Sequence, residues 1–516
     1  MSSDPRFARE ALQLHYFFAV QRLGGRGNGG PLLSLLWESC AQAGMNATPQ
    51  PGGDLSLPLD LAEGPGFLSL RQRTDPAGTR QAMLYRLHDT IGLTVMLAAD
   101  EGPGRTAAES AQVLHALGQS WDRSRSRAAA TLGQDGSGDL SLLGTVRVHR
   151  SLIRPGTAAL PAEFALAGEA LRQELSPASR LSRPVETENG IALWEIIEPG
   201  AGFHTDRVLL LTTESTDEQE GQLDDWSWSA AHDGLVPLTR YLINATLIRD
   251  QYRVRAENGA RLNDRLRRLR QHGEELTRDW QRLTADTATR PHTSRRDLAR
   301  WESIATQAQA VLAEERLAGA TTTDLRAMAR TVEIAAAKMR ALGTDADGRP
   351  RTLDSDEEFR TRLPEVLDDD LTYLAIAREQ VTEAARVATE SSAQRLQSHQ
   401  QYLTLIQTTV IGALLMTLTA VQALEYKLPL PGRLHAPLIA LLGSLGLGLP
   451  LMVLRRWRAG TGGRMSGTLE LVSLTAIGAA AGWLAGSITG HTTVGVLTGT
   501  VLLVAAGLWL TRRPGH

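Results

Sequence analysis

The chain has almost no cysteine: Cys40 is the only one among 516 residues. A single thiol excludes an internal disulfide and any cysteine-rich zinc site, and it is typical of a reducing compartment. The residues Met1 to Pro5 lack the basic start and apolar core of a secretory signal peptide. The formal net charge is only −3, so the chain as a whole has no electrostatic attraction for nucleic acid. We therefore expect a cytosolic front part and no specific nucleic-acid partner.

Sequence motifs of the common enzyme classes are also missing. The chain contains no Walker A loop, no Rossmann glycine fingerprint after a strand, no zinc-protease helix motif and no serine-hydrolase elbow. We therefore expect no catalytic residue, no cofactor and no bound metal.

Four long apolar blocks close the chain. Each contains at most one formal charge, and short polar loops separate them: 405–424, 437–454, 468–488 and 494–510. A bilayer core needs about 20 apolar residues per helix, and only helices satisfy their backbone polar groups in lipid without a closed barrel. The sequence therefore predicts a region of four transmembrane helices over residues 401–513.

Cationic side chains predict the orientation of these four helices. Arginines lie between the second and third blocks and after the fourth: Arg455, Arg456, Arg458, Arg464, Arg512 and Arg513. Cationic loops stay on the cytoplasmic side of a membrane. Four crossings then place both termini in the cytoplasm, which predicts a multi-pass protein of the bacterial inner (cell) membrane with the lipid bilayer as a partner.

Glycines recur at every fourth residue in the last two apolar blocks: Gly478, Gly482, Gly486, Gly495 and Gly499. This spacing leaves a smooth groove along one helix face, where a second helix can approach closely. The groove is explained either by a hairpin within one chain or by an oligomer interface. No ionisable residue lies in the middle of a block, which argues against a proton-coupled carrier.

Before residue 235 the predicted elements run twice through strand, helix, strands and helix. The first pass comprises residues 12–20, 32–43, 66–73, 80–87, 90–98 and 106–130, and the second comprises 143–153, 161–175, 191–197, 207–213 and a helix from about 223. We interpret this order as an α+β region of two tandem ferredoxin-like modules, residues 1–135 and 136–234. The interpretation depends on element order alone, because no residue-level repeat accompanies it.

Residues 235–400 are predicted to be helical almost throughout. A heptad seam broken only by Gly273 indicates a coiled coil: Leu262, Leu266, Leu269, Leu276, Trp280 and Leu283. Helix breaks are expected at Gly319 and at 343–350. The last helix of this region is expected to start after Asp370 and to run into the apolar blocks. The seam predicts a homo-oligomer.

Several polar groups could carry chemistry, and each also has a structural explanation. His88 and Asp89 could be a base and its orienting carboxylate, but a neighbouring pair without a nucleophile is more typical of a turn. The run 368–370 of three aspartates could bind a divalent metal, but it would equally favour the positive end of a helix dipole. Cys40 matches no nucleophile signature and is expected to be a small buried side chain.

Two further groups could contact partners. Arginines crowd the stretch 249–270, which could bind an acidic protein, anionic lipid or nucleic acid, although a solvated flank of the coiled coil explains it as well. Trp194, Trp226 and Trp228 could form a binding hot spot, or they could anchor the α+β region to the helices.

Two segments resemble the large protein of the bacterial CATRA conflict systems, which are named for their association with caspase-like proteases and tetratricopeptide-repeat (TPR) proteins. One is the opening strand LQLHYFFAV, 12–20, which carries His15. The other is the hairpin AMLYRLHDTIGLTVM, 82–96, in which an apolar strand, His88-Asp89 and a second apolar strand follow one another. The helical middle and the apolar C-terminal region are similar in layout.

A second resemblance is weaker. CorA-type magnesium channels also place an α+β region before long helices and membrane helices, and they carry Gly-Met-Asn after the first membrane helix. Here Gly-Met-Asn occurs at 44–46, far from the apolar blocks, and CorA-type chains end with two spans instead of four. We therefore set this resemblance aside.

The CATRA resemblance implies a component of a bacterial conflict, or antiviral defence, system. It carries over no catalytic residue, and the caspase-like protease would be a separate chain. We expect a membrane-anchored, non-enzymatic component that links a cytosolic docking or sensing region to a membrane anchor or effector and acts with a caspase-like or TPR partner. The alternatives are a channel or transporter with a cytosolic regulatory domain, and an enzyme whose active site is too divergent to recognise.

Overall fold

Two compact units divide the chain. The first comprises Met1–Asn263 and Thr321–Tyr373, and the second comprises Asp264–Ala320 and Leu374–His516. The computed structural model describes residues 5–23, 30–49, 53–57, 64–133, 141–154, 160–199, 206–228, 234–288, 295–339, 342–344, 350–426, 431–458 and 467–512. The predicted division into four parts stays a prediction.

An 11-stranded sheet forms the centre of the first unit, with the strand order β11-β10-β7-β8-β9-β5-β1-β4-β3-β2 and with β6 paired to β8. Its strands are β1 (Phe7–Ala19), β2 (Phe67–Thr74), β3 (Arg80–Leu87), β4 (Thr90–Ala98), β5 (Leu142–Ile153), β6 (Arg180–Leu181), β7 (Val185–Glu186), β8 (Ala192–Ile197), β9 (Asp206–Glu214), β10 (Gly343–Thr344) and β11 (Pro350–Arg351). The predicted α+β region is confirmed. Its two halves share this one sheet, because β1 pairs antiparallel with β5.

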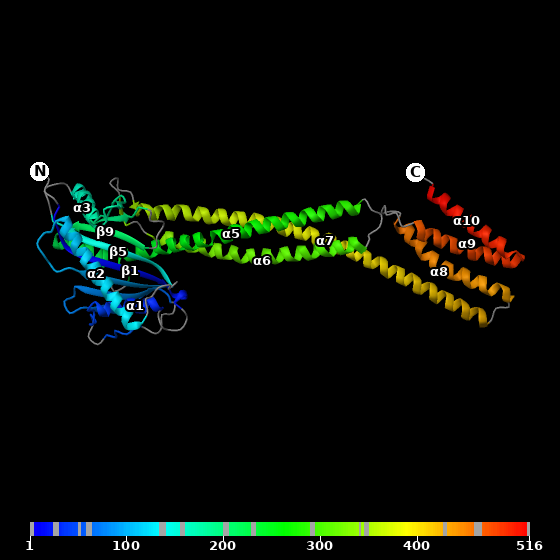
Figure 1. Ribbon diagram of the computed structural model, residues 1–516, viewed down its shortest axis with the longest axis horizontal. Coiled ribbons are helices and arrows are strands. Elements are labelled where there is room, and N and C mark those ends of the chain that lie inside the picture. Colours follow the sequence, from blue (N-terminus) through cyan, green and yellow to red (C-terminus); the bar gives the residue numbers. More distant parts are fainter. Residues whose placement is uncertain are drawn as a thin grey trace. The chain divides into compact units, whose positions relative to one another are not determined.

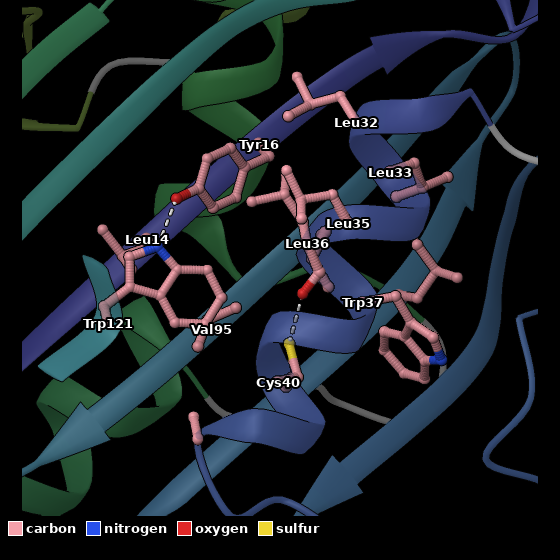
Figure 2. Close-up of a cluster of buried hydrophobic side chains, with 14 of the residues drawn as sticks. Leu14, Tyr16, Leu32, Leu33, Leu35, Leu36, Trp37, Cys40, Val95 and Trp121 are labelled. Carbon is pink, nitrogen blue, oxygen red and sulfur yellow. Dashed lines mark hydrogen bonds between the residues drawn. The ribbon is translucent and has the colours of Figure 1, made fainter. Parts of the chain in front are cut away.

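Helices cover one face of the sheet: α1 (Pro31–Gln42), α2 (Ala107–Leu132) and α3 (Leu160–Leu175) (Figure 1). Figure 2 shows Leu14 and Tyr16 of β1 against the apolar face of α1, with Trp121 of α2 donating its indole N–H to the Tyr16 hydroxyl at 2.9 Å. A second cluster packs Phe164 of α3 against Trp194 of β8. These contacts follow from the alternation of side chains along a strand, which directs every second residue to the helices.

The opposite face of the sheet carries more polar side chains. Gln13 of β1 donates to Ser227 of α4 (Asp217–Ser227) at 3.2 Å, and Trp228 donates to Gln81 of β3 at 2.9 Å. Arg22 of the 3-10 helix η1 (Val20–Arg22) pairs with the buried Asp250 at 2.9 Å. Asp250 lies on the first long helix, which this ion pair ties to the segment that follows β1.

Three long helices follow: α5 (Pro237–Ala288), α6 (Arg295–Lys338) and α7 (Asp354–Tyr426). The predicted helical middle is confirmed, but two of its details are wrong. Gly319 lies inside α6, where helix hydrogen bonds continue past it, and Asp368–Asp370 lie inside α7, which begins at Asp354. Glycine costs a helix only about 1 kcal/mol, so packing against neighbouring helices overrides the expected break.

In the second unit these helices bury the predicted seam inside one chain. Leu269, Leu276 and Leu283 are buried, whereas Leu266 and Trp280 are half-buried; Leu262, in the first unit, is also buried. His272 of α5 contacts Glu314 of α6 at 2.7 Å, and Arg378 of α7 pairs with Glu315 of α6 at 2.5 Å. A Cβ at Gly273 would lie 2.9 Å from Cγ2 of Val381 in α7, so the break in the heptad pattern is a point of close helix approach.

The C-terminal region contains the 3-10 helix η2 (Gly432–Leu434) and the helices α8 (His435–Arg458), α9 (Gly467–Thr489) and α10 (Thr492–Arg512). The repeated glycines lie where α9 meets α10. A Cβ on Gly478 would lie 2.7 Å from the carbonyl oxygen of Gly499, and one on Gly482 would lie 2.1 Å from that of Gly495. Gly486 is equally close to the backbone of Thr492. The glycines thus allow two backbones of the same chain to pack closely.

The prediction of four transmembrane helices is wrong. Within the described ranges, no helix combines the length and the apolar character that a membrane span requires. The described side chains of α9 and α10 include many glycine, alanine and threonine residues, which gain little free energy on transfer to lipid. The predicted multi-pass location in the inner membrane, with both termini cytoplasmic, is wrong for the same reason.

The predicted topology determinants lie outside the described side chains. Arg455, Arg456 and Arg458 are at the end of α8, Arg512 is the last residue of α10, and Arg513 follows it. Exposed apolar side chains are described on the last part of α7, including Leu414, Leu415 and Leu418, and on α10.

Candidate functional site

A strained two-residue turn joins β3 to β4. His88 has a φ of +55°, in the left-handed region that glycine normally occupies. The backbone N–H of Gly66 donates to Nδ1 of His88 at 3.3 Å, which leaves the ring proton on Nε2. The N–H of Val20 donates to the carbonyl oxygen of Asp89 at 2.9 Å. Backbone strain of this kind costs about 1–3 kcal/mol and is concentrated at functional sites, so the turn is a candidate.

The turn forms one wall of a cavity of about 640 Å³ within the first unit. The other walls come from Phe67 of β2, the start of α5 and the end of α6. The lining residues are Phe67, Leu87, His88, Asp89, Thr90, Gly234, Leu235, Arg240, Ile243, Asn244, Leu247, Thr331, Ile334, Ala335, Ala337 and Lys338. The volume falls within the range of about 300–1,000 Å³ that is typical of ligand pockets. We refer to this cavity as the turn pocket.

The turn pocket has an apolar floor and a charged rim. Leu235, Ile243 and Ala335 are buried, whereas Arg240 and Lys338 are exposed. Arg240 donates from Nη2 to the carbonyl oxygen of Leu235 at 2.9 Å, which holds the guanidinium at the rim.

The rim charges are not paired with each other. Across the described ranges, no ion pair involves Arg240, Lys338 or Asp89. The pocket therefore offers two cations and one carboxylate over an apolar surface.

A buried ionic network lies on the same face of the sheet. Arg207 of β9 contacts Glu195 of β8 at 2.9 Å and Asp356 of α7 at 3.0 Å. Arg249 of α5 contacts Asp356 at 2.9 Å and Glu195 at 3.4 Å. Tyr241 of α5 donates to Asp356 at 2.7 Å. The network joins two strands to two long helices, and we refer to it as the Arg207–Asp356 network.

The charges of this network stabilise each other despite burial. Burial alone would raise the pKa of Asp356, but Arg207 and Arg249 hold that pKa below its ordinary value of 3.8. The same two guanidinium groups hold the pKa of Glu195 below 4.5 against the effect of burial. The carboxylates in turn raise the pKa of Arg207, which burial would lower. Asp356, Glu195 and Arg207 are therefore charged at neutral pH, and the network joins the sheet to the helices.

Two residues singled out in the sequence are buried in the core. Burial lowers the pKa of His15 to about 3, and its Nδ1 lies 3.1 Å from the Thr94 hydroxyl. Burial raises the pKa of the Cys40 thiol to about 12, and the thiol donates to the carbonyl oxygen of Leu36 at 3.3 Å (Figure 2). A thiol in this state is a poor nucleophile.

The aspartate run forms no metal site in the described part of the chain, which contains no metal-binding cluster of His, Cys, Asp or Glu. Asp370 instead pairs with Arg255 at 3.1 Å. Arg253 pairs with Asp250 at 2.5 Å, so several arginines of the crowded stretch have partners within the chain.

The tryptophans lie in packed positions. Trp194 and Trp226 are buried, and Trp228 is held by its bond to Gln81. The structure thus brings His88 and Asp89 to a pocket but does not bring His15, Cys40, the aspartate run or the tryptophans to it.

No pattern in the sequence predicted that Arg240 and Lys338 would lie in the same pocket as His88. They are about 100 residues apart in the chain, and their approach to the turn depends on how α5 and α6 pack. Only the adjacent His88-Asp89 pair in a predicted hairpin marked this location.

Comparisons with known proteins identify the family. Residues 11–231 match CATRA-N, the CASPASE and TPR Repeat-Associated N-terminal domain, and residues 236–381 match CATRA-C, the corresponding C-terminal domain. The chain therefore belongs to the CATRA family. The predicted resemblance is confirmed, and the two domains associate the chain with caspase and TPR conflict systems.

Two other comparisons add little. No curated protein matches the chain. Among solved structures, the CorA magnesium transporter from Methanocaldococcus jannaschii is similar over 60% of this chain and 90% of its own length, with 14% identity and a TM-score of 0.24. A similarity this low carries no argument about fold or function.

Proposed function

We propose that this protein is a non-enzymatic docking component of a conflict system, and that its first unit binds a separate caspase-like or TPR protein. The observation that carries the proposal is the match of both CATRA domains over residues 11–381. The turn pocket supports it, because a preformed cavity whose rim charges have no ion-pair partner in the described part of the chain is suited to binding.

A non-enzymatic role is supported by the surroundings of the candidate groups. The turn pocket places His88 and Asp89 beside each other, but the described residues of its lining include no serine or cysteine to act as nucleophile. The single thiol, Cys40, is buried away from the pocket with a raised pKa. Binding therefore explains the pocket better than covalent catalysis does.

The experiment is co-elution of the purified full chain with the caspase-like protease and the TPR protein of the same system, each added separately. We expect one of them to co-elute as a complex of defined mass. The chain alone should show no peptidase or ester hydrolase turnover above that of buffer. If neither protein forms a complex with the chain, the docking role is refuted. If the chain alone shows turnover, the non-enzymatic role is refuted.

A further inference from the structure

We propose that the turn pocket recognises a short peptide segment of the partner in which a carboxylate side chain lies next to an apolar one. This inference rests on the proposed docking function and specifies the chemistry that the docking site binds. It follows from the charges of the rim, the character of the floor and the position of Asp89.

The rim cations indicate an anionic group. Some exposed arginines elsewhere on α6 and α7 have a carboxylate partner in the chain: Arg330 contacts Glu333 at 2.6 Å, and Arg362 contacts Glu358 at 2.5 Å. Among the described residues, no carboxylate is paired with Arg240 or Lys338, although both line the same cavity. A carboxylate bound there would pair with two cations that have no acidic partner among the described residues.

The floor indicates that the ligand also has an apolar group. The apolar lining that water still reaches comprises Phe67, Leu87 and Leu247, which are half-buried, and Ile334, which is 40% exposed. Filling this surface with an apolar side chain removes it from water, which is the main source of binding free energy in pockets of this kind. A simple inorganic anion would leave the floor uncovered.

The carboxylate of Asp89 favours a peptide over a nucleic acid. Asp89 is exposed at the rim, and its backbone is fixed by the bond from Val20. A peptide backbone N–H could donate to this carboxylate, whereas a phosphate backbone would be repelled by it. The combination of two cations, one acceptor and an apolar floor therefore matches a peptide with neighbouring acidic and apolar side chains.

The test uses overlapping synthetic peptides that cover the caspase-like and TPR proteins of the same system, measured by fluorescence polarisation with the full chain. We expect the bound peptides to share an acidic residue adjacent to an apolar one. Lys338→Glu should weaken the binding of such a peptide by about tenfold, because it replaces attraction with repulsion at the rim. Changing the peptide's acidic residue to lysine should restore part of the binding to the K338E variant.

Arg326→Glu is the matched control. Arg326 is exposed on the same helix, carries the same charge and does not line the pocket, so this variant should bind like the original chain. His88→Gly is a second variant that keeps the turn, since glycine adopts the positive φ of His88 without strain. It removes the ring and its bond to Gly66 while relieving the backbone strain, and we expect weaker peptide binding with an unfolding temperature that does not fall.

The outcomes separate this inference from the docking function. If a full-length partner binds the original chain and K338E equally well, the turn pocket is not the binding site. The docking function would remain intact. If K338E and R326E lose the same amount of peptide affinity, the loss is a non-specific effect of charge. That result would also overturn the proposal that the turn pocket binds the peptide. An oligonucleotide that displaces the peptide at lower concentration than a second acidic peptide does would overturn the peptide assignment. If neither the caspase-like nor the TPR protein binds the original chain, both proposals are refuted.

Discussion

Asp356 is the residue on which the joint between the sheet and the long helices most depends. It is buried and accepts from Arg207 of β9 and from Arg249 and Tyr241 of α5, two segments far apart from Asp356 in the chain. Removing one partner from a buried ion pair is costly, because the remaining charge stays buried without compensation. A network of this kind therefore fixes which strands meet which helices.

Replacing this carboxylate by an amide should destabilise the first unit strongly. For Asp356→Asn we expect a loss of about 3–5 kcal/mol in the free energy of unfolding, because two buried guanidinium groups then share only Glu195. Asp354→Asn is the control: Asp354 is half exposed and only 3.4 Å from Arg351 in a surface pair, so its loss should cost less than about 0.5 kcal/mol. Urea unfolding followed by circular dichroism measures both, and equal effects would contradict the role of the network.

The same network predicts how stability depends on pH. The folded pKa values of Asp356 and Glu195 lie below their ordinary values of 3.8 and 4.5, so the unfolded chain binds protons more readily than the folded one. Their contribution to stability is therefore complete at neutral pH and is lost as the pH falls below about 4 and through the folded pKa values. Unfolding measured from about pH 6 to about pH 3 should show a steeper loss for the original chain than for Asp356→Asn. If the free energy of unfolding falls equally steeply with pH in both chains, other carboxylates determine the loss of stability in acid.

At this scale the sequence predicted some roles and missed others. Cys40 was predicted to be a small buried side chain, and its position in the core agrees. His88 and Asp89 were interpreted as a turn, and they form one. The cavity beside them and the pairing of Arg249 with Asp356 depend on contacts between segments about 100 residues apart, for which a single sequence contains no spacing signal.

At the scale of elements, hydrophobic periodicity predicted most of the helices and strands. The strands β3 and β4 have the predicted bounds, because alternating apolar residues flank a short polar turn. The two-residue strands β6, β7, β10 and β11 were missed, because so few residues show no periodicity. The unbroken course of α6 through Gly319 was missed because packing outweighs the low helix propensity of one glycine.

The seam of α5 should contribute to stability within one chain. Leu269 is 1% exposed, whereas Leu266, one turn away on the same helix, is half-buried. We expect Leu269→Ala to cost about 2–5 kcal/mol in the free energy of unfolding and Leu266→Ala clearly less, since a deeper side chain leaves a larger cavity. The unfolding temperatures of the two variants, measured by circular dichroism, give the comparison. A fall in the oligomeric mass of Leu269→Ala, measured by light scattering, would instead support the predicted homo-oligomeric coiled coil.

The close packing of α9 and α10 should fail when a side chain is added at the contact. For Gly482→Val we expect the hairpin to separate locally at a cost of about 1–3 kcal/mol, because its Cβ would meet the backbone oxygen of Gly495. Faster amide hydrogen exchange over residues 475–505 would show that the two helices have separated locally. Gly412→Val is the control, because no atom lies within 4 Å of its added Cβ. Similar exchange in the two variants would contradict the packing.

At the scale of the whole molecule, the sequence predicted the family and the succession of an α+β region and long helices. The transmembrane prediction failed, because apolar composition alone does not distinguish a membrane span from helices that pack through glycine, alanine and threonine. The joining of two predicted modules into one sheet was also missed, since strand order along the chain does not reveal that β1 pairs with β5.

We expect the first unit to bind its partner through the turn pocket. Amide hydrogen exchange of the full chain, measured with and without the caspase-like or TPR partner that co-elutes with it, locates the surface that the partner covers. We expect the partner to slow exchange in residues 85–92, 234–247 and 331–338, which surround the pocket, and to leave 475–505 unchanged. Protection confined to other segments, with these three unaffected, would contradict the account.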